Sequence, residues 1–134
     1  MTQLPRELWV DLIGAPFKRD ARGPEYWDCY GLLREIYRRR GIEVAEIGEL
    51  VRELSRTGYS DDLAATYTQW RPCPIQSGAA LLFRRGNVPD HVGVAIDTDR
   101  FIHALESHGQ VRLDRLTGVR PYGAFLLGAF DYAV

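Results

Sequence analysis

Cysteine and histidine are the residues of this chain that could carry out nucleophilic chemistry, and both are scarce. The 134 residues contain two cysteines, Cys29 and Cys73, and three histidines, His91, His103 and His108. A thiolate is a strong nucleophile, and a nearby imidazole can accept the proton of the thiol. The two cysteines lie too far apart in the sequence for a metal-binding pair or a disulfide framework. The combination therefore indicates acyl transfer from an amide or ester carbonyl.

Cys29 is predicted to lie in the first turn of a helix. The spacing of apolar residues indicates a helix from about residue 28 to residue 40, with Gly41 as the stop signal. Free amides and the positive end of the helix dipole stabilise a thiolate at that position. The alternative is that Cys29 is a small buried apolar residue, as most free cysteines are. Cys73, between two prolines, is predicted to lie in an extended loop and to be structural or incidental.

Two of the histidines are predicted to lie on neighbouring strands. His91 opens an alternating segment over residues 92–96, and His103 lies inside a segment over residues 101–105. A histidine between apolar neighbours can also be an ordinary core residue with a hydrogen-bond partner. His108, in a Ser-His-Gly turn, is expected to be solvated.

The register of this hairpin decides whether the histidines can act together. A two-residue turn would pair Val94 with His103 and place the two histidines on opposite faces. A three-residue loop would pair Gly93 with His103 and place both histidines on one face. We favour the second register because it explains the small residues Gly93 and Ala95, which would let the helix that carries Cys29 approach that face closely.

In that arrangement the three side chains can form a cysteine nucleophile site. Cys29 would attack the carbonyl carbon, and His91 would act as its base. His103 would fix the ring orientation and tautomer of His91. The Cys29 amide, at a helix start, would stabilise the oxyanion.

The elements that must position these residues fall into two groups. Four helices are expected in the first half of the chain, over residues 5–13, 28–40, 45–56 and 60–67, with a loop over residues 15–27. Five strands are expected afterwards, over residues 79–83, 92–96, 101–105, 110–113 and 124–132. This order predicts a single domain, residues 1–134, of the α+β class, with helices packed on an antiparallel sheet.

Composition excludes several classes of partner. The net charge is −1, so neither nucleic acid nor an anionic membrane is expected as the main partner. No apolar run reaches the roughly 18 residues of a membrane-spanning helix. The first residues lack the pattern of a signal peptide, so we expect cytoplasmic synthesis.

Several blocks, in order, resemble the NlpC/P60 cysteine peptidases, and together they cover nearly the whole chain. The blocks are Asp28-Cys29-Tyr30-Gly31-Leu32, Ser77-Gly78-Ala79-Ala80-Leu81-Leu82-Phe83, His91-Val92-Gly93-Val94 and Phe101-Ile102-His103-Ala104. The resemblance implies a compact papain-like α+β fold, with N-terminal helices packed on a C-terminal antiparallel sheet. It also implies Cys29, His91 and His103 as the catalytic residues, no metal or other cofactor, and peptidoglycan peptides as substrate.

The aromatic residue after the cysteine narrows this resemblance. Tyr30, together with the Gly41-Ile42 pair after the helix, is similar to the phage-tail branch of the family, the lambda tail protein K type. This branch implies other tail proteins as partners, and a location in the virion tail with action at the cell wall.

Two positions depart from the family pattern. Phe17 stands where the family often has a tyrosine whose hydroxyl lies near the nucleophile, and Ala79 replaces a common aspartate. Two other functions therefore stay open. One is a non-catalytic tail-assembly subunit with the same fold, and the other is an amidase or acyltransferase that acts on another substrate.

Overall fold

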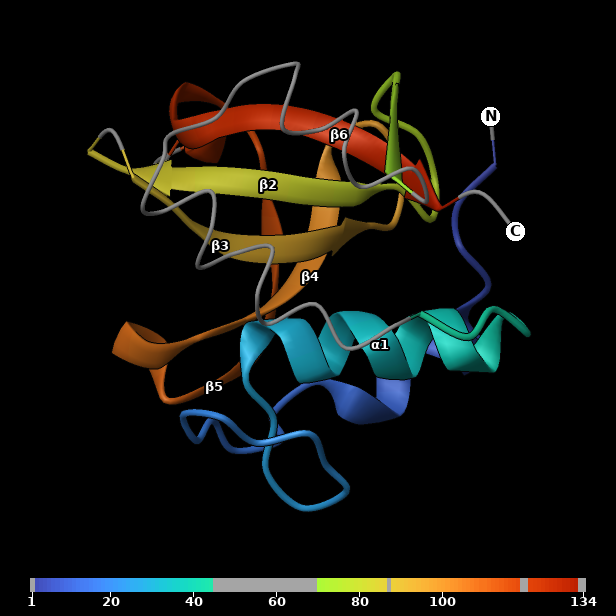
Figure 1. The fold of residues 1–134 in the computed structure, drawn as a ribbon, viewed down its shortest axis with the longest axis vertical. Helices are drawn as coiled ribbons and strands as arrows, with labels where there is room; N and C mark the ends of the chain where they lie inside the picture. The colour runs from blue at the N-terminus through green and yellow to red at the C-terminus, as the bar shows by residue number, and fades with distance from the viewer. Residues whose placement is uncertain (1, 45–69, 87, 119–120, 133–134) are drawn as a thin grey trace.

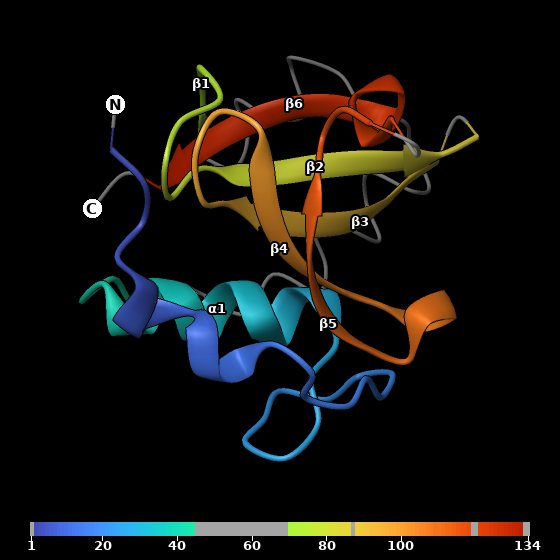
Figure 2. The same ribbon diagram turned by 180° about the vertical axis from the view of Figure 1, so that it is seen from behind.

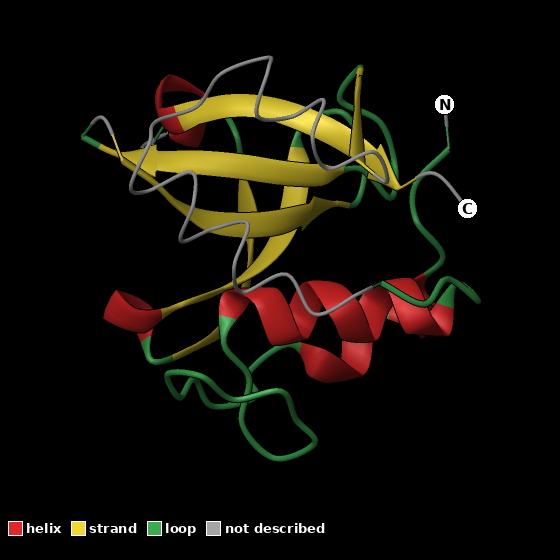
Figure 3. Ribbon diagram, viewed as in Figure 1, coloured by secondary structure: helices red, strands yellow, loops and turns green. Residues whose placement is uncertain are grey.

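The computed structural model of the chain describes residues 2–44, 70–86, 88–118 and 121–132. In this part of the chain one α-helix, α1 (Cys29–Arg39), packs against one antiparallel sheet of six strands (Figures 1 and 3). None of the described helices is both long enough and apolar enough to cross a membrane. The helices predicted over residues 45–56 and 60–67 lie outside the described residues.

Four consecutive strands of the sheet form a meander, and two further strands lie side by side beyond the first strand of that meander (Figure 2). The strands are β1 (Trp70–Cys73), β2 (Ala80–Arg85), β3 (Val88–Ala95), β4 (Arg100–Leu105), β5 (Gln110–Arg115) and β6 (Leu126–Tyr132), in the spatial order β1-β6-β2-β3-β4-β5. Strands β2 to β5 follow one another in space as in sequence, as the alternating pattern predicts, and β6 pairs with β2 instead of β5.

Strand β1 was not expected from the sequence. The segment that contains Pro72 and Cys73 was predicted to be a loop, but it pairs with β6 at the edge of the sheet. Proline cannot donate a ladder hydrogen bond, and an edge strand is where a sheet tolerates it. The proline therefore indicates an edge position and not the absence of a strand.

The N-terminal segment forms two short 3-10 helices, η1 (Arg6–Leu8) and η2 (Val10–Leu12), and not the single helix expected over residues 5–13. Trp9 interrupts helical geometry with φ −144°. Its indole is buried, and its Nε1 donates a hydrogen bond to the Leu4 carbonyl oxygen at 2.9 Å. The free energy gained by burying this large side chain exceeds the weak local preference for a helix, so burial determines the backbone conformation here.

Helix α1 begins where the sequence predicts. Asp28 is its N-cap, and the Gly31 amide donates to Asp28 Oδ1 at 2.6 Å. One face of the helix is buried, with Leu32, Leu33, Ile36 and Tyr37 at 2% exposure or less. The Tyr37 hydroxyl donates to the Gly78 carbonyl oxygen at 2.7 Å and ties the helix to the segment before β2.

The helix covers the opposite face of the sheet from the one we expected. Its apolar residues share a core with Val92, Val94 and Ile102, whereas Ala95 and Phe101 belong to a second core on the other face. The small residue Gly93 leaves space for side chains of β4 and not for the helix. A Cβ at Gly93 would lie 3.1 Å from Phe101 Cδ2 and 3.3 Å from His103 Cβ. The branched residues fill the space under the helix, and the small residues accommodate the aromatic and histidine rings.

Replacement of Gly31 by alanine is expected to destabilise the protein, although alanine normally favours a helix by about 1 kcal/mol. The new Cβ would lie 2.5 Å from the Ala21 carbonyl oxygen and 2.9 Å from Arg22 Cα, which are backbone atoms that cannot rotate away. We expect a loss of about 2 kcal/mol, measured as a lower midpoint of urea unfolding. The exposed Arg38→Ala on the same helix serves as a control for helix propensity. A Gly31→Ala midpoint equal to that of the wild type would contradict the close approach.

Candidate active site

Cys29 is the first residue of α1, and its thiol is half-buried against Val92 of β3. The backbone amides of Val92 and Tyr30 favour the thiolate, as expected for a helix start. Burial of the thiol has a larger effect than these two amides, and the negative charge of Asp28 acts in the same direction as burial. The pKa of the Cys29 thiol therefore rises to about 11. The expected stabilisation of the thiolate is therefore wrong for the resting site, because desolvation is a larger effect than the helix terminus.

The raised pKa predicts slow alkylation of Cys29 at neutral pH. A pKa of about 11 instead of 9.0 leaves roughly one hundredth of the thiolate of an ordinary cysteine at pH 7. In a Cys73→Ser background, the rate of reaction with iodoacetamide should rise about tenfold per pH unit up to pH 10. A rate that is already at its plateau below pH 7 would contradict this prediction, because it would indicate a thiolate–imidazolium pair at rest.

His91 and His103 lie on one face of the sheet, as the favoured register predicts. Strands β3 and β4 pair Val94 with Ile102 and Ala95 with Phe101, which places Gly93 opposite His103. The turn closes with a hydrogen bond from the Ile96 amide to the Arg100 carbonyl oxygen, so three residues form the loop. His91 Nε2 lies 2.8 Å from His103 Nδ1.

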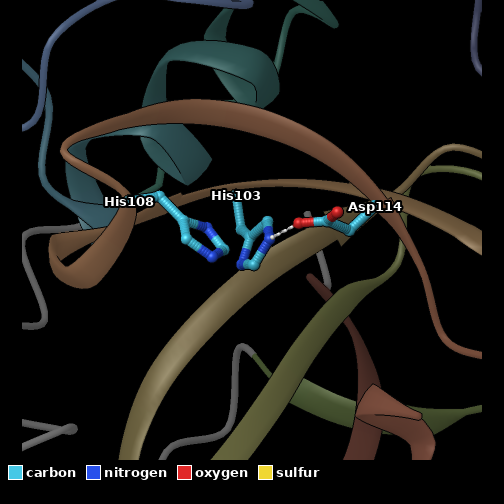
Figure 4. A group of neighbouring side chains, drawn as sticks. All are labelled: His103, His108 and Asp114. Atoms are coloured by element: carbon cyan, nitrogen blue, oxygen red, sulfur yellow. Dashed lines mark hydrogen bonds and ion pairs between the residues drawn. The ribbon is translucent and has the colours of Figure 1, made fainter. Parts of the chain in front are cut away.

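Asp114 extends this chain of hydrogen bonds, and the sequence reasoning missed it. His103 Nε2 lies 2.8 Å from Asp114 Oδ2 (Figure 4). Strand β5 pairs His103 with Arg112 and Phe101 with Asp114, so the carboxylate shares the histidine face. The second hairpin register, which follows from a loop over residues 106–109, is the signal that could have identified Asp114.

The three groups fix the tautomers of both histidines. Burial lowers the pKa of both rings, that of His91 to about 3, so both are neutral at pH 7. A carboxylate accepts hydrogen bonds, so His103 carries its proton on Nε2 and its Nδ1 accepts the Nε2 proton of His91. His91 Nδ1 is therefore the unprotonated atom, which is available to accept the proton of a thiol.

Replacement of Asp114 by asparagine should reduce activity through the tautomer. The amide can donate to His103 Nε2, which would place protons on Nδ1 of both rings and occupy the basic atom of His91. We expect kcat to fall about 10- to 1,000-fold with a small change in KM and in thermal stability. The measurement is steady-state hydrolysis across pH 5–9. An unchanged pH profile with equal losses of stability and activity would indicate a structural role.

Aromatic rings surround the histidines and explain their desolvation. The His103 side chain is fully buried, and the Tyr122 ring, from η4 (Tyr122–Phe125), lies with its centroid 5.5 Å from the imidazole centroid. The Phe101 ring centroid lies 4.4 Å from that of His103, and the Phe83 ring centroid lies 5.7 Å from that of His91. Such surroundings exclude water and disfavour the charged imidazolium.

His108 lies beside this network and is half-buried instead of solvated as expected. It ends η3 (Glu106–His108), and its ring centroid is 6.3 Å from that of His103. The donor atoms of His103, His108 and Asp114 all lie within 4.8 Å of one another. In the described part of the chain, this is the group with the ligand types and the spacing to hold a metal ion.

The Cys29 thiol contacts the residue next to His91 on β3, because the Val92 amide hydrogen-bonds to the Cys29 sulfur and His91 precedes Val92 in the chain. This contact is the one through which the structure relates the thiol to the strand that carries His91. In the described residues, no hydrogen bond joins Cys29 Sγ to His91, and the Cys29 amide has no acceptor. Such contacts often tighten when substrate binds. The arrangement can support nucleophilic attack by the thiol, proton transfer to His91 and oxyanion binding at the helix start.

The structure is a papain-like α+β domain with a cysteine at the start of its helix and a histidine pair on two adjacent strands. The chain belongs to the NlpC/P60 family, whose model matches residues 14–126.

The relatives agree with this assignment. The chain is 28% identical over 116 residues to the "Probable endopeptidase p60" of Listeria grayi, a match that covers 87% of this chain and 20% of that protein. An NLP/P60-family lipoprotein-like structure from Staphylococcus aureus superposes with a TM-score of 0.68 at 19% identity, over 99% of this chain and 44% of that one. The NlpC/p60 domain of the peptidoglycan hydrolase SagA superposes with a TM-score of 0.56 at 18% identity, over 82% of this chain and 85% of that one.

Proposed function

We propose that this chain is a cysteine endopeptidase that cleaves stem or cross-bridge peptide bonds of peptidoglycan. The observation that carries the proposal is the chain of hydrogen bonds from Asp114 through His103 to His91, which leaves His91 Nδ1 unprotonated one residue before Val92, whose amide contacts the Cys29 thiol. The names of the relatives, an endopeptidase and a peptidoglycan hydrolase, support the choice of substrate.

The proposed reaction proceeds through a thioester. Cys29 Sγ attacks the peptide carbonyl carbon while His91 Nδ1 accepts the thiol proton, and the Cys29 amide donates to the oxyanion. The C–N bond then breaks, and His91 returns the proton to the leaving amine. Water attacks the thioester with His91 as base, which releases the acid and restores the thiol. His103 and Asp114 hold the His91 ring and tautomer throughout.

The direct test is digestion of purified peptidoglycan followed by mass spectrometry of the fragments. We expect new amino termini in the stem or cross-bridge peptides with the wild type and none with Cys29→Ala. Fragments of another kind, such as released sugars, would contradict an endopeptidase. Turnover of simple amides or esters without wall cleavage would favour the amidase or acyltransferase function instead.

We further propose that the protein works in a phage or phage-like tail and acts at the cell wall with other tail proteins. The aromatic Tyr30 after the nucleophile and the Gly41-Ile42 pair after α1 support this placement. Detection of the chain in purified tails by an antibody would test it. Its absence from tails, with activity in another cell fraction, would contradict the placement and leave the peptidase proposal intact.

The alternative of a non-catalytic tail subunit has two observations in its favour. Phe17 lacks the hydroxyl that the family often places near the nucleophile, and the Cys29 thiol is protonated at rest. This alternative requires the absence of any turnover, together with tail assembly that Cys29→Ala leaves unchanged.

A further inference from the structure

We propose that His103, His108 and Asp114 form a binding site for a divalent transition-metal ion of the zinc class, and that occupancy of this site switches the Cys29–His91 pair off. The binding step does not depend on the proposed peptidase function, whereas the inhibition does. The three ligands come from consecutive elements, β4, η3 and β5, and the His103 ring lies between the His108 ring and the Asp114 carboxylate, with all donor atoms within 4.8 Å of one another (Figure 4).

The ligand set has the composition of a zinc site. Two imidazole nitrogens and one carboxylate oxygen suit Zn²⁺, and three protein ligands leave one position for water. Zinc bonds of about 2.0–2.2 Å place tetrahedral ligand atoms roughly 3.3 Å apart. The donor atoms here lie between 2.8 Å and 4.8 Å apart, so binding requires side-chain shifts of about 1 Å.

The surroundings allow an ion to enter and hold its ligands. A solvent-facing cavity of about 1090 Å³ is lined by His108 and Asp114, which provides an entry path and space for the water ligand. Arg112 Nη2 donates to Asp114 Oδ1 at 3.3 Å and would orient the carboxylate from behind. Two other arginines line the cavity, but Arg100 pairs with Asp97 and Arg115 with Asp99, which reduces their repulsion of a cation.

The ion would compete directly with the hydrogen bond that sets the tautomers. In the free site, His103 carries its proton on Nε2, the atom that faces Asp114. A metal ion on Nε2 displaces this proton. The proton on His91 Nε2 then moves to His103 Nδ1, and His91 Nδ1 takes up a proton from solvent. Each ring still carries one proton, and one proton is released for each one taken up.

This tautomer exchange explains why the ion would inhibit. His91 Nδ1, the atom that must accept the thiol proton, is protonated in the metal-bound form. Metal-bound histidines normally donate their second ring N–H to a neighbouring group, which here is His91. A metal ion on His103 Nε2 would therefore prevent His91 from accepting the thiol proton, although the ion itself would not contact Cys29.

The test combines binding and activity. We expect isothermal titration of ZnCl₂ to give one equivalent per chain with equal affinity for the wild type and Cys29→Ala, and at least about tenfold weaker binding for His108→Gln. In hydrolysis assays Zn²⁺ should inhibit the wild type, and chelation should reverse the inhibition. His108→Gln should keep its basal activity and require at least about tenfold more Zn²⁺.

Each arm has an outcome that overturns part of the proposal. Loss of Zn²⁺ binding in Cys29→Ala, or unchanged binding in His108→Gln, would place the ion at the thiol or elsewhere and refute the site. Binding that requires His108 but leaves activity intact would refute the tautomer exchange. Titration needs no substrate, so an inactive protein would refute the proposed function without deciding the metal site.

Discussion

Replacement of Cys29 by alanine is expected to abolish hydrolysis of peptidoglycan peptides, with kcat falling about 10⁴- to 10⁶-fold. Removal of the proposed nucleophile eliminates the covalent route through a thioester. The measurement is release of new amino groups from purified peptidoglycan or a stem peptide. The substitution removes a single half-buried sulfur atom, so the melting temperature should stay close to that of the wild type.

Cys73 provides the matched control for this prediction. It is also a half-buried free cysteine, but it lies on the edge strand β1 and pairs with Ala129. Cys73→Ala should therefore keep full activity. Residual activity of Cys29→Ala above about 1% of the wild type would contradict a cysteine nucleophile and direct attention to another residue.

Replacement of His91 by alanine should have the second-largest effect, a loss of about 10³-fold or more in kcat. The Cys29 thiol has a raised pKa of about 11, so attack at neutral pH depends on a base that accepts its proton. The variant should regain part of its rate at high pH, where solvent deprotonates the thiol. Rates measured from pH 6 to pH 10 give this comparison directly.

The double variant of Cys29 and His91 tests whether the two residues act as one unit. Groups that act together are strongly non-additive, so Cys29→Ala with His91→Ala should be no slower than Cys29→Ala alone. His108→Gln, assayed in the presence of a chelator, is the control for loss of a nearby imidazole. A His91→Ala enzyme within tenfold of the wild type would contradict its role as base.

Local sequence patterns predicted the elements that carry the site. The apolar spacing after Cys29 predicted α1 to within one residue, because its buried face repeats at helical period. The small residues between His91 and His103 correctly favoured the three-residue loop, although for a different reason than we gave. Gly93 accommodates Phe101 and His103 on its own face, and the helix packs on the other.

Long-range pairing accounts for the features that the sequence pattern missed. Strand β1 pairs with β6, which is distant in the chain. Because proline has a low strand propensity, an interpretation based on propensity does not predict β1. Asp114 on β5 reaches His103 on the adjacent strand β4, so its role depends on the register of a hairpin that apolar alternation alone does not specify.

The sequence alone determined which residues could act together: a cysteine at a helix start and two histidines on one face of a hairpin. Periodicity and turn length determine these features within short segments of the chain. The tertiary structure decided which face the helix covers, which carboxylate orients the histidines, and that the pKa of the Cys29 thiol is raised and not lowered. These properties depend on burial, and burial sums contacts between segments that are far apart in the sequence.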